Sequence, residues 1–197
     1  VNVTAGMTFA VGLRALLRQD PDIIMIGETR DAETAEISVR SAITGHLVVS
    51  TLHTNDAISS IVRLADMGVA PYLISNSVVG IVAQRLVRKV CQFCKYEEPA
   101  TAEDIAIVGD GIPMITRGKG CKVCNNTGYK GRISIHEMVY IDKTLKRMIA
   151  RSADSQEMLE YAKKTQGMRS LMDSAIDLVK EGVTTPEEVM KIAYYSD

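Results

Sequence analysis

A short apolar run that ends in an acidic residue constrains this 197-residue chain more than any other feature. Residues 23–26 are Ile-Ile-Met-Ile, preceded by Pro21 and followed by Gly27 and Glu28. A run this short, rich in β-branched residues and bounded by Pro and Gly, predicts a fully buried strand of a parallel sheet. Ligands of open α/β sheets bind at the carboxyl ends of the strands, so Glu28 is a candidate functional residue.

Two interpretations of Glu28 are open at this point. An acidic side chain after an apolar strand is typical of a Walker B element, which serves Mg²⁺ and the attacking water in nucleoside triphosphatases. Alternatively, Glu28 only caps the helix that we expect to begin near Asp31.

A second strand and turn follow the first along the chain. Residues 47–51 are Leu-Val-Val-Ser-Thr, which predicts a second buried strand, and they lead into His53. For the helix expected between the two strands, Asp31 is a candidate N-cap and Gly45 marks the end. In a right-handed βαβ unit both strand ends lie on the same rim, so we expect Glu28 and His53 at one edge of the sheet. His46, which opens the second strand, is interpreted as structural.

Two arginines precede the first strand on a predicted helix over residues 8–19. Arg14 and Arg18 are four residues apart and therefore share a helix face. The pair is either a solvated basic face, the usual case, or two guanidinium groups aimed at phosphate.

The four cysteines form two C-x₂-C pairs, Cys91 with Cys94 and Cys121 with Cys124, separated by 26 residues. Such pairs supply four thiolates to a tetrahedral structural Zn²⁺, with no open position for catalysis. Two redox pairs or free buried thiols are the alternatives. Residues 95–120 contain too few large apolar side chains to close this loop by burial alone, so we expect a metal to supply the missing cross-link.

We expect an α/β fold with three segments. Residues 1–90 carry the strands and helices of the core, residues 91–131 form a tetracysteine metal-binding subdomain, and residues 132–197 form a strand followed by a helical subdomain. An apolar stripe in the last segment predicts packing against another surface. It is formed by Leu171, Ala175, Leu178 and Val179.

Composition excludes several classes of protein. The net charge of −1 gives no electrostatic case for nucleic acid as a partner. No apolar run approaches the ~20 residues that a membrane helix needs, and we find no signal peptide. The chain starts with Val1 directly in motif-like sequence, so we interpret it as a piece of a longer protein.

Several motifs, taken together and in order, resemble those of the secretion ATPase superfamily, in its type II secretion and type IV pilus assembly branch. They occupy residues 12–14, 18–22, 27–31, 44–56 and 84–88. The resemblance is dense from residue 1 to about residue 140 and looser in the helical tail.

This resemblance implies a partial RecA-like core of a hexameric, cytoplasmic ATPase that uses Mg²⁺ with ATP. Such enzymes lie at the inner face of the cytoplasmic membrane without spanning it. They act with inner-membrane platform proteins to assemble pseudopilins or pilins.

The resemblance also implies roles for individual residues. Glu28 matches the Walker B glutamate that polarises the attacking water, and His53 matches a histidine thought to sense the γ-phosphate. Three arginines match residues that are implicated either at the nucleotide-binding site or at the interface between subunits. They are Arg14, Arg18 and Arg30. The cysteine pairs match the zinc-binding subdomain of the assembly and secretion branch, which the pilus-retraction branch generally lacks.

The chain departs from the family pattern in two places. Thr29 stands where the family typically has Ile, and no G-x-x-x-x-G-K-[ST] loop occurs in the sequence. That loop cradles the β and γ phosphates, so we expect the chain alone to be inactive. The alternative hypothesis is a zinc-stabilised, catalytically inactive module that docks on the platform. A phosphate-binding loop encoded upstream of Val1 would favour the ATPase.

Overall fold

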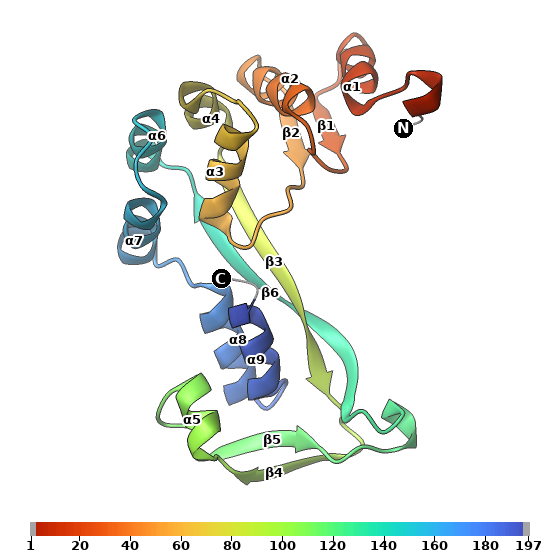
Figure 1. Ribbon diagram of the computed structural model, residues 1–197, viewed down its shortest axis with the longest axis vertical. Helices are drawn as coiled ribbons and strands as arrows, with labels where there is room; N and C mark the ends of the chain where they lie inside the picture. Colours follow the sequence, from red (N-terminus) through yellow and green to blue (C-terminus); the bar gives the residue numbers. More distant parts are fainter. Residues whose placement is uncertain (1–2, 195–197) are drawn as a thin grey trace. The chain divides into compact units, whose positions relative to one another are not determined.

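The computed structural model describes residues 3–194, which form helices and three two-stranded sheets (Figure 1). The chain divides into two compact units, one made of Val1–Ile81 and Val139–Gly167, the other of Val82–Met138 and Met168–Asp197. The expected α/β fold class is confirmed. The division into units cuts across the three segments anticipated from the sequence.

The first unit contains two strands and most of the helices. Its elements are η1 (Val3–Ala5), α1 (Phe9–Leu17), β1 (Ile23–Ile26), α2 (Ala32–Ile43), β2 (Leu47–Ser50), α3 (Ala57–Asp66), α4 (Pro71–Ser77), α6 (Lys143–Ala150) and α7 (Ser155–Gln166).

The second unit is built on an antiparallel pair of strands and three α-helices. Its elements are β4 (Lys95–Pro99), α5 (Ala102–Val108), β5 (Met114–Gly118), η2 (Lys122–Cys124), α8 (Leu171–Lys180) and α9 (Pro186–Tyr194). Two long strands pair with each other and contribute residues to both units. They are β3 (Gly80–Val90) and β6 (Tyr129–Tyr140).

Strands β1 and β2 pair in parallel, with Ile23 opposite Leu47 and Ile26 opposite Ser50. Helix α1 packs against α2, and the two lie on the same side of the strands (Figure 1). Leu13 of α1 and Ile24 and Ile26 of β1 form a buried cluster. The predicted βαβ unit is therefore present.

The prediction that β1 is buried on both faces is wrong for the described chain. The side chains of β1 alternate, so that Ile24 and Ile26 are buried while Ile23 and Met25 are 64% and 67% exposed. Leu47 and Val49 of β2 are also exposed on this sheet. A strand is buried on both faces only when other elements cover both faces of its sheet. In the described chain, α1 and α2 cover one face of the β1–β2 sheet.

The segment between the cysteine pairs packs into a core that it shares with helices α8 and α9. The expectation that it has too few apolar side chains to close by burial is wrong. Val108, Ile112 and Ile115 are buried against the stripe of α8 and against α9. That stripe was expected to need a partner surface, and this segment supplies it.

Ion pairs join helix α9 to β3 and β5, and the carboxylate of Glu188 in them is buried. Glu188 accepts hydrogen bonds from the backbone N–H and the guanidinium of Arg88, and from Lys191. Arg117 of β5 pairs with Asp104 at 2.7 Å, and also with Glu187. Because each charge is paired, burying these groups does not leave an unsatisfied charge in the core.

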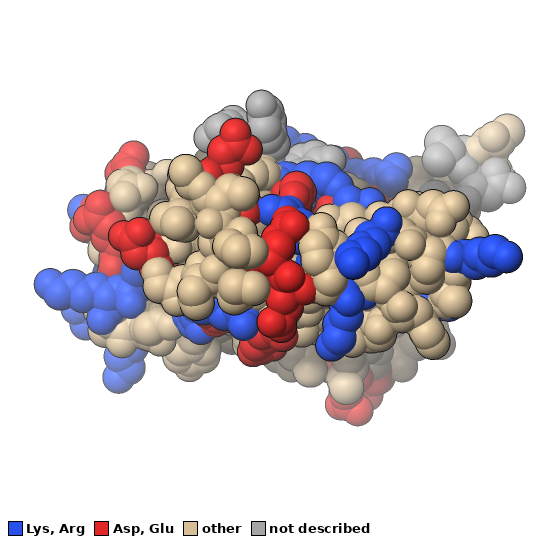
Figure 2. Space-filling model, turned by 90° about the horizontal axis from the view of Figure 1, so that it is seen from below, with Lys and Arg blue, Asp and Glu red and all other residues tan. Residues whose placement is uncertain are grey.

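Charges elsewhere on the surface are mixed. The face in Figure 2 carries a stripe of acidic side chains with basic ones on both sides, so neither sign covers it continuously. Among residues 3–194, no helix combines the length and hydropathy needed to cross a membrane.

Glu188 gives the fold a testable dependence on pH. Burial by itself would raise the pKa of Glu188, but the hydrogen bonds from Arg88 and Lys191 outweigh it and hold this pKa below its usual 4.5. The stabilisation is complete well above pH 4.5 and is lost as the pH falls through 4.5 towards the lower pKa of the folded state.

We therefore expect Glu188→Gln to lower the free energy of unfolding at pH 7 by about 2 kcal/mol, because one oxygen facing Arg88 becomes an amide. Urea unfolding at pH 7 and pH 4 measures this, and the variant should lose less stability than wild type on acidification. Glu36→Gln, in the exposed pair with Arg40, is the control. Equal effects of the two substitutions would contradict the prediction.

Candidate functional site

Hydrogen bonds join the turns that follow β1 and β2. The Thr29 N–H donates to the Thr51 carbonyl at 2.9 Å, and the Thr51 hydroxyl donates to the Gly27 carbonyl at 2.6 Å. The hydroxyl groups of Thr29 and Ser50 are 2.8 Å apart. These bonds hold the two turns on one rim, as the βαβ topology predicts.

The helices that follow these turns have their own caps. The carboxylate of Asp31 accepts the Thr34 N–H at the start of α2, and that of Asp56 accepts the Ser59 N–H at the start of α3. Asp31 was the predicted N-cap and is confirmed. Since Asp31 caps α2, Glu28 is not needed as a cap.

The structure brings Glu28, Arg30 and His53 together at the carboxyl ends of the strands. Arg30 Nε lies 2.5 Å from Glu28 Oε2, and His53 Nε2 lies 3.3 Å from the same oxygen. The Glu28 side chain is 23% exposed, whereas the His53 side chain is 83% exposed. The hydrogen bond from Arg30 lowers the pKa of Glu28 below its usual value, burial opposes this, and His53 adds to it. Glu28 is therefore held as a carboxylate.

The other two predicted arginines do not contact this group. Arg14 Nη1 is 2.7 Å from the carboxylate of Glu33 on α2, and both side chains are more than half exposed. Arg18 is the C-cap residue of α1 and is exposed. Among the described residues, neither arginine makes an ion pair with Glu28.

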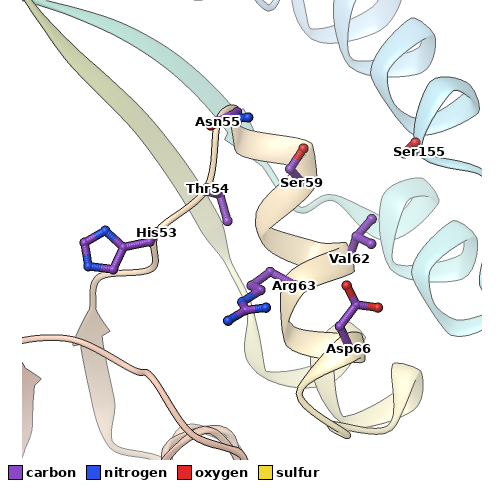
Figure 3. Close-up of a pocket in the computed structure, with 8 residues that line it drawn as sticks. All are labelled: His53, Thr54, Asn55, Ser59, Val62, Arg63, Asp66 and Ser155. Atoms are coloured by element: carbon purple, nitrogen blue, oxygen red, sulfur yellow. The ribbon is translucent and has the colours of Figure 1, made fainter. Parts of the chain in front are cut away.

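A cavity of about 380 Å³ lies beside His53, along α3 (Figure 3). Arg63 lines it with Thr54, Asn55 and Ser59, and Ser155 of α7 closes another side. We did not single out Arg63 from the sequence. The sequence position could have indicated Arg63, because it lies on α3, the helix that starts directly after the turn with His53. Arg63 is seven residues beyond Asp56, the N-cap of this helix.

The four cysteines lie together, as predicted. Their sulfur atoms all lie within 4.8 Å of one another. Cys91 and Cys121 are 3.9 Å apart, as are Cys94 and Cys124, while Cys121 and Cys124 are 3.7 Å apart. A tetrahedral Zn²⁺ with Zn–S bonds of about 2.3 Å requires sulfur separations of about 3.8 Å. The donor set and its spacing therefore fit zinc.

Backbone groups also point at the sulfur atoms. The Cys121 N–H donates to the sulfur of Cys124 at 3.2 Å. Burial by itself would raise the pKa of Cys124, but the backbone N–H groups of Cys121 and Gly128 outweigh it and lower this pKa to about 6. Since the thiolate is the metal-binding form, these backbone donors favour Cys124 as a ligand, whereas burial and the neighbouring thiols raise the pKa of Cys94 to about 12.

Glycines let the two knuckles approach each other. A Cβ on Gly118 would lie 2.2 Å from the Gly128 carbonyl oxygen, and one on Gly120 would lie 2.9 Å from that of Asn126. Gly120 and Gly128 also have positive φ angles, which favour glycine. The flanking glycines thus permit a close backbone contact as well as tight turns.

Comparison with known proteins gives matches over nearly the whole chain. The model of the family "Type II/IV secretion system protein" matches residues 1–191. The chain is 48% identical over 192 residues to the type II secretion system protein HxcR of Pseudomonas aeruginosa, covering 98% of this chain and 38% of that protein. It is 47% identical over 195 residues to the type II secretion system ATPase E of Vibrio cholerae, with the same coverage.

A pilus protein is about equally similar. The type IV pilus assembly ATPase PilB of Thermus thermophilus is 46% identical over 195 residues, which cover 96% of this chain and 22% of that protein. The chain thus spans 22–38% of the length of these relatives.

Two solved structures share the fold. The pilus retraction motor PilT with bound ADP superposes with a TM-score of 0.66 at 28% identity, over 94% of this chain and 43% of PilT. The ATPase DotB of Legionella pneumophila gives a TM-score of 0.63 at 22% identity, over 95% of this chain and 42% of DotB.

The contact between the knuckles predicts a sensitive position. We expect Gly118→Ala to destabilise the second unit by about 1–3 kcal/mol, because backbone must move to admit the methyl group. Urea unfolding monitored by hydrogen exchange measures this unit by unit. In the control Gly12→Ala, on α1, the added Cβ meets only Met7 Sδ at 3.9 Å. A Gly118→Ala protein as stable as wild type would show that the contact is not tight in solution.

Proposed function

Because the chain belongs to the family of type II/IV secretion system proteins, we propose that it is the C-terminal part of an ATPase. This ATPase powers the assembly of pseudopilins or pilins in type II secretion or type IV pilus biogenesis. The observation that carries the proposal is Glu28, ionised at the carboxyl end of β1 and contacted by Arg30 and His53. This is the place and the chemistry of a Walker B glutamate.

The chain's own residues have defined tasks in this proposal. Glu28 accepts a hydrogen bond from the attacking water and so aligns it with the phosphate. His53 shares an oxygen of Glu28 and, with its exposed ring, reaches phosphate beside the carboxylate. Arg14 and Arg18, both exposed on α1, supply positive charge to the nucleotide or to a neighbouring subunit. Mg²⁺, when bound with ATP, neutralises charge that develops on the phosphates.

Other parts of the proposed ATPase lie outside this chain, in the rest of the same protein and in its partners. The phosphate-binding loop lies in an N-terminal segment of the same protein. The protein forms a hexamer in the cytoplasm, at the inner face of the membrane, and acts on inner-membrane platform proteins. Its similarity to both secretion and pilus-assembly ATPases, at 46–48% identity, supports assembly or export over retraction.

We further propose that Cys91, Cys94, Cys121 and Cys124 hold a structural Zn²⁺. Four thiolates complete the tetrahedron and leave no position for a substrate. The ion would join the end of β3 to the start of β6 and so fix the base of the antiparallel pair β4–β5.

The role of Glu28 is tested in a full-length protein that contains this chain. We expect Glu28→Gln to abolish ATP hydrolysis and to leave nucleotide binding intact, because the amide keeps the shape of the side chain without its charge. Steady-state turnover and fluorescent-nucleotide binding measure the two effects. Glu36→Gln, on the exposed surface of α2, is the matched control. No hydrolysis by the unmodified protein would favour the inactive docking module instead.

The metal is tested on this chain as it stands. We expect one Zn²⁺ per chain. Its affinity should fall at low pH, because protons compete with the metal for the thiolates. Chelation should raise hydrogen exchange near residues 91–94 and 119–128, and should leave the β1–β2 sheet protected, because its core is elsewhere. Elemental analysis and hydrogen exchange check both parts. Carefully reduced protein without zinc would refute the site.

A further inference from the structure

The contacts of Glu28 are asymmetric. Arg30 Nε, at 2.5 Å, and His53 Nε2, at 3.3 Å, both contact Oε2. Within the described part of the chain, no hydrogen bond reaches Oε1, and the closest approach of both partners is to Oε2. One carboxylate oxygen is thus anchored, and the other is left to accept a hydrogen bond from water.

The backbone around this carboxylate is fixed, but its side chain is not. Thr29 is tied to Ser50 and Thr51, so the turn that carries Glu28 cannot shift along β2. The Glu28 side chain has rotatable bonds of its own, and no backbone N–H among residues 3–194 donates to it. The orientation of the carboxylate is therefore set by its two side-chain contacts, and the contact with Arg30 is the shorter one.

From this geometry we propose that Arg30 is a positioning residue, which holds Glu28 by Oε2 and so presents Oε1 to the attacking water. The inference rests on the proposed ATPase function. It differs from the role that the family resemblance implies for Arg30, which is contact with nucleotide or with a neighbouring subunit.

The two roles predict different effects of removing the guanidinium. A phosphate-binding arginine contributes to ATP binding, so its loss raises KM. An arginine that acts through Glu28 changes the state of the carboxylate, so its loss lowers kcat and alters the pH dependence. Since the hydrogen bond from Arg30 lowers the pKa of Glu28, its loss raises that pKa and protonates the carboxylate at a higher pH.

Other charged groups near this turn do not replace Arg30. His53 contacts the same oxygen at a longer distance. Asp31 is occupied by the N–H and hydroxyl of Thr34. Arg14, on the helix packed against α2, is paired with Glu33.

The first experiment uses this chain with ¹³C-labelled glutamate and follows the carboxyl signals by NMR from pH 3 to pH 8. Glu28→Gln assigns the signal of Glu28. We expect Arg30→Gln to shift the Glu28 titration to higher pH, Arg30→Lys to restore part of the shift, and Arg40→Gln to leave it unchanged. Arg40 is the matched control because it is similarly exposed and also pairs with a glutamate. An unchanged Glu28 titration in Arg30→Gln would overturn the proposal.

The second experiment measures ATP hydrolysis by the full-length protein across pH. We expect Arg30→Gln to lower kcat and to move its acidic limb to higher pH with KM for ATP unchanged, and Arg40→Gln to behave as wild type. A raised KM with an unmoved acidic limb would overturn the proposal and assign Arg30 to the nucleotide. If the unmodified protein does not hydrolyse ATP, the proposed function fails, whereas hydrolysis with no shift in the NMR titration rejects only the role of Arg30.

Discussion

The parallel pairing of β1 and β2 is the interaction on which the candidate active site depends. Glu28 and His53 are 25 residues apart, and they meet because their strands end at the same rim. The hydrogen bonds between Thr29, Ser50 and Thr51 continue this pairing beyond the strands. A change of register by one residue would move the turns and turn each side chain to the other face of the sheet.

The same sheet explains why the apolar faces of this unit are unequal. Leu13 of α1 packs on Ile24 and Ile26, whereas Ile23 and Met25 point away from that core. Opposite these two exposed residues lie Leu47 and Val49 of β2, so the four side chains share one face. Parallel strands are normally covered on both faces. The apolar sequence of β1 is typical of a strand that is covered on both faces. In the described chain, helices cover only one face of this sheet.

In the second unit, ion pairs and a metal-binding geometry reinforce each other. Arg88 stacks on the ring of Tyr129 at 3.9 Å and pairs with Glu188, which joins β3, β6 and α9 just before the first cysteine. Arg117 joins β5 to α5 and α9 just before the second pair. The strands that lead into both knuckles are thus anchored in a folded core, which reduces the conformational entropy lost when four sulfur atoms converge.

The sequence by itself determined the two strands, the N-cap of the helix between them, and the groups that could do chemistry. These features are local: an apolar run bounded by Pro and Gly, an Asp before a helix, and two C-x₂-C turns each depend on a few neighbouring residues. For the same reason, the sequence indicated that Glu28 and His53 share a rim, because the handedness of a βαβ unit is nearly invariant.

Tertiary structure alone decided which contacts each group makes. Arg30 and Arg14 were equivalent candidates in the sequence, but one contacts Glu28 and the other contacts Glu33 on α2. Residues 95–120 appeared too polar to close by burial, because their partners on α8 and α9 lie more than fifty residues away along the chain. Side-chain rotamers and long-range packing set these outcomes, and neither is encoded in the spacing of nearby residues.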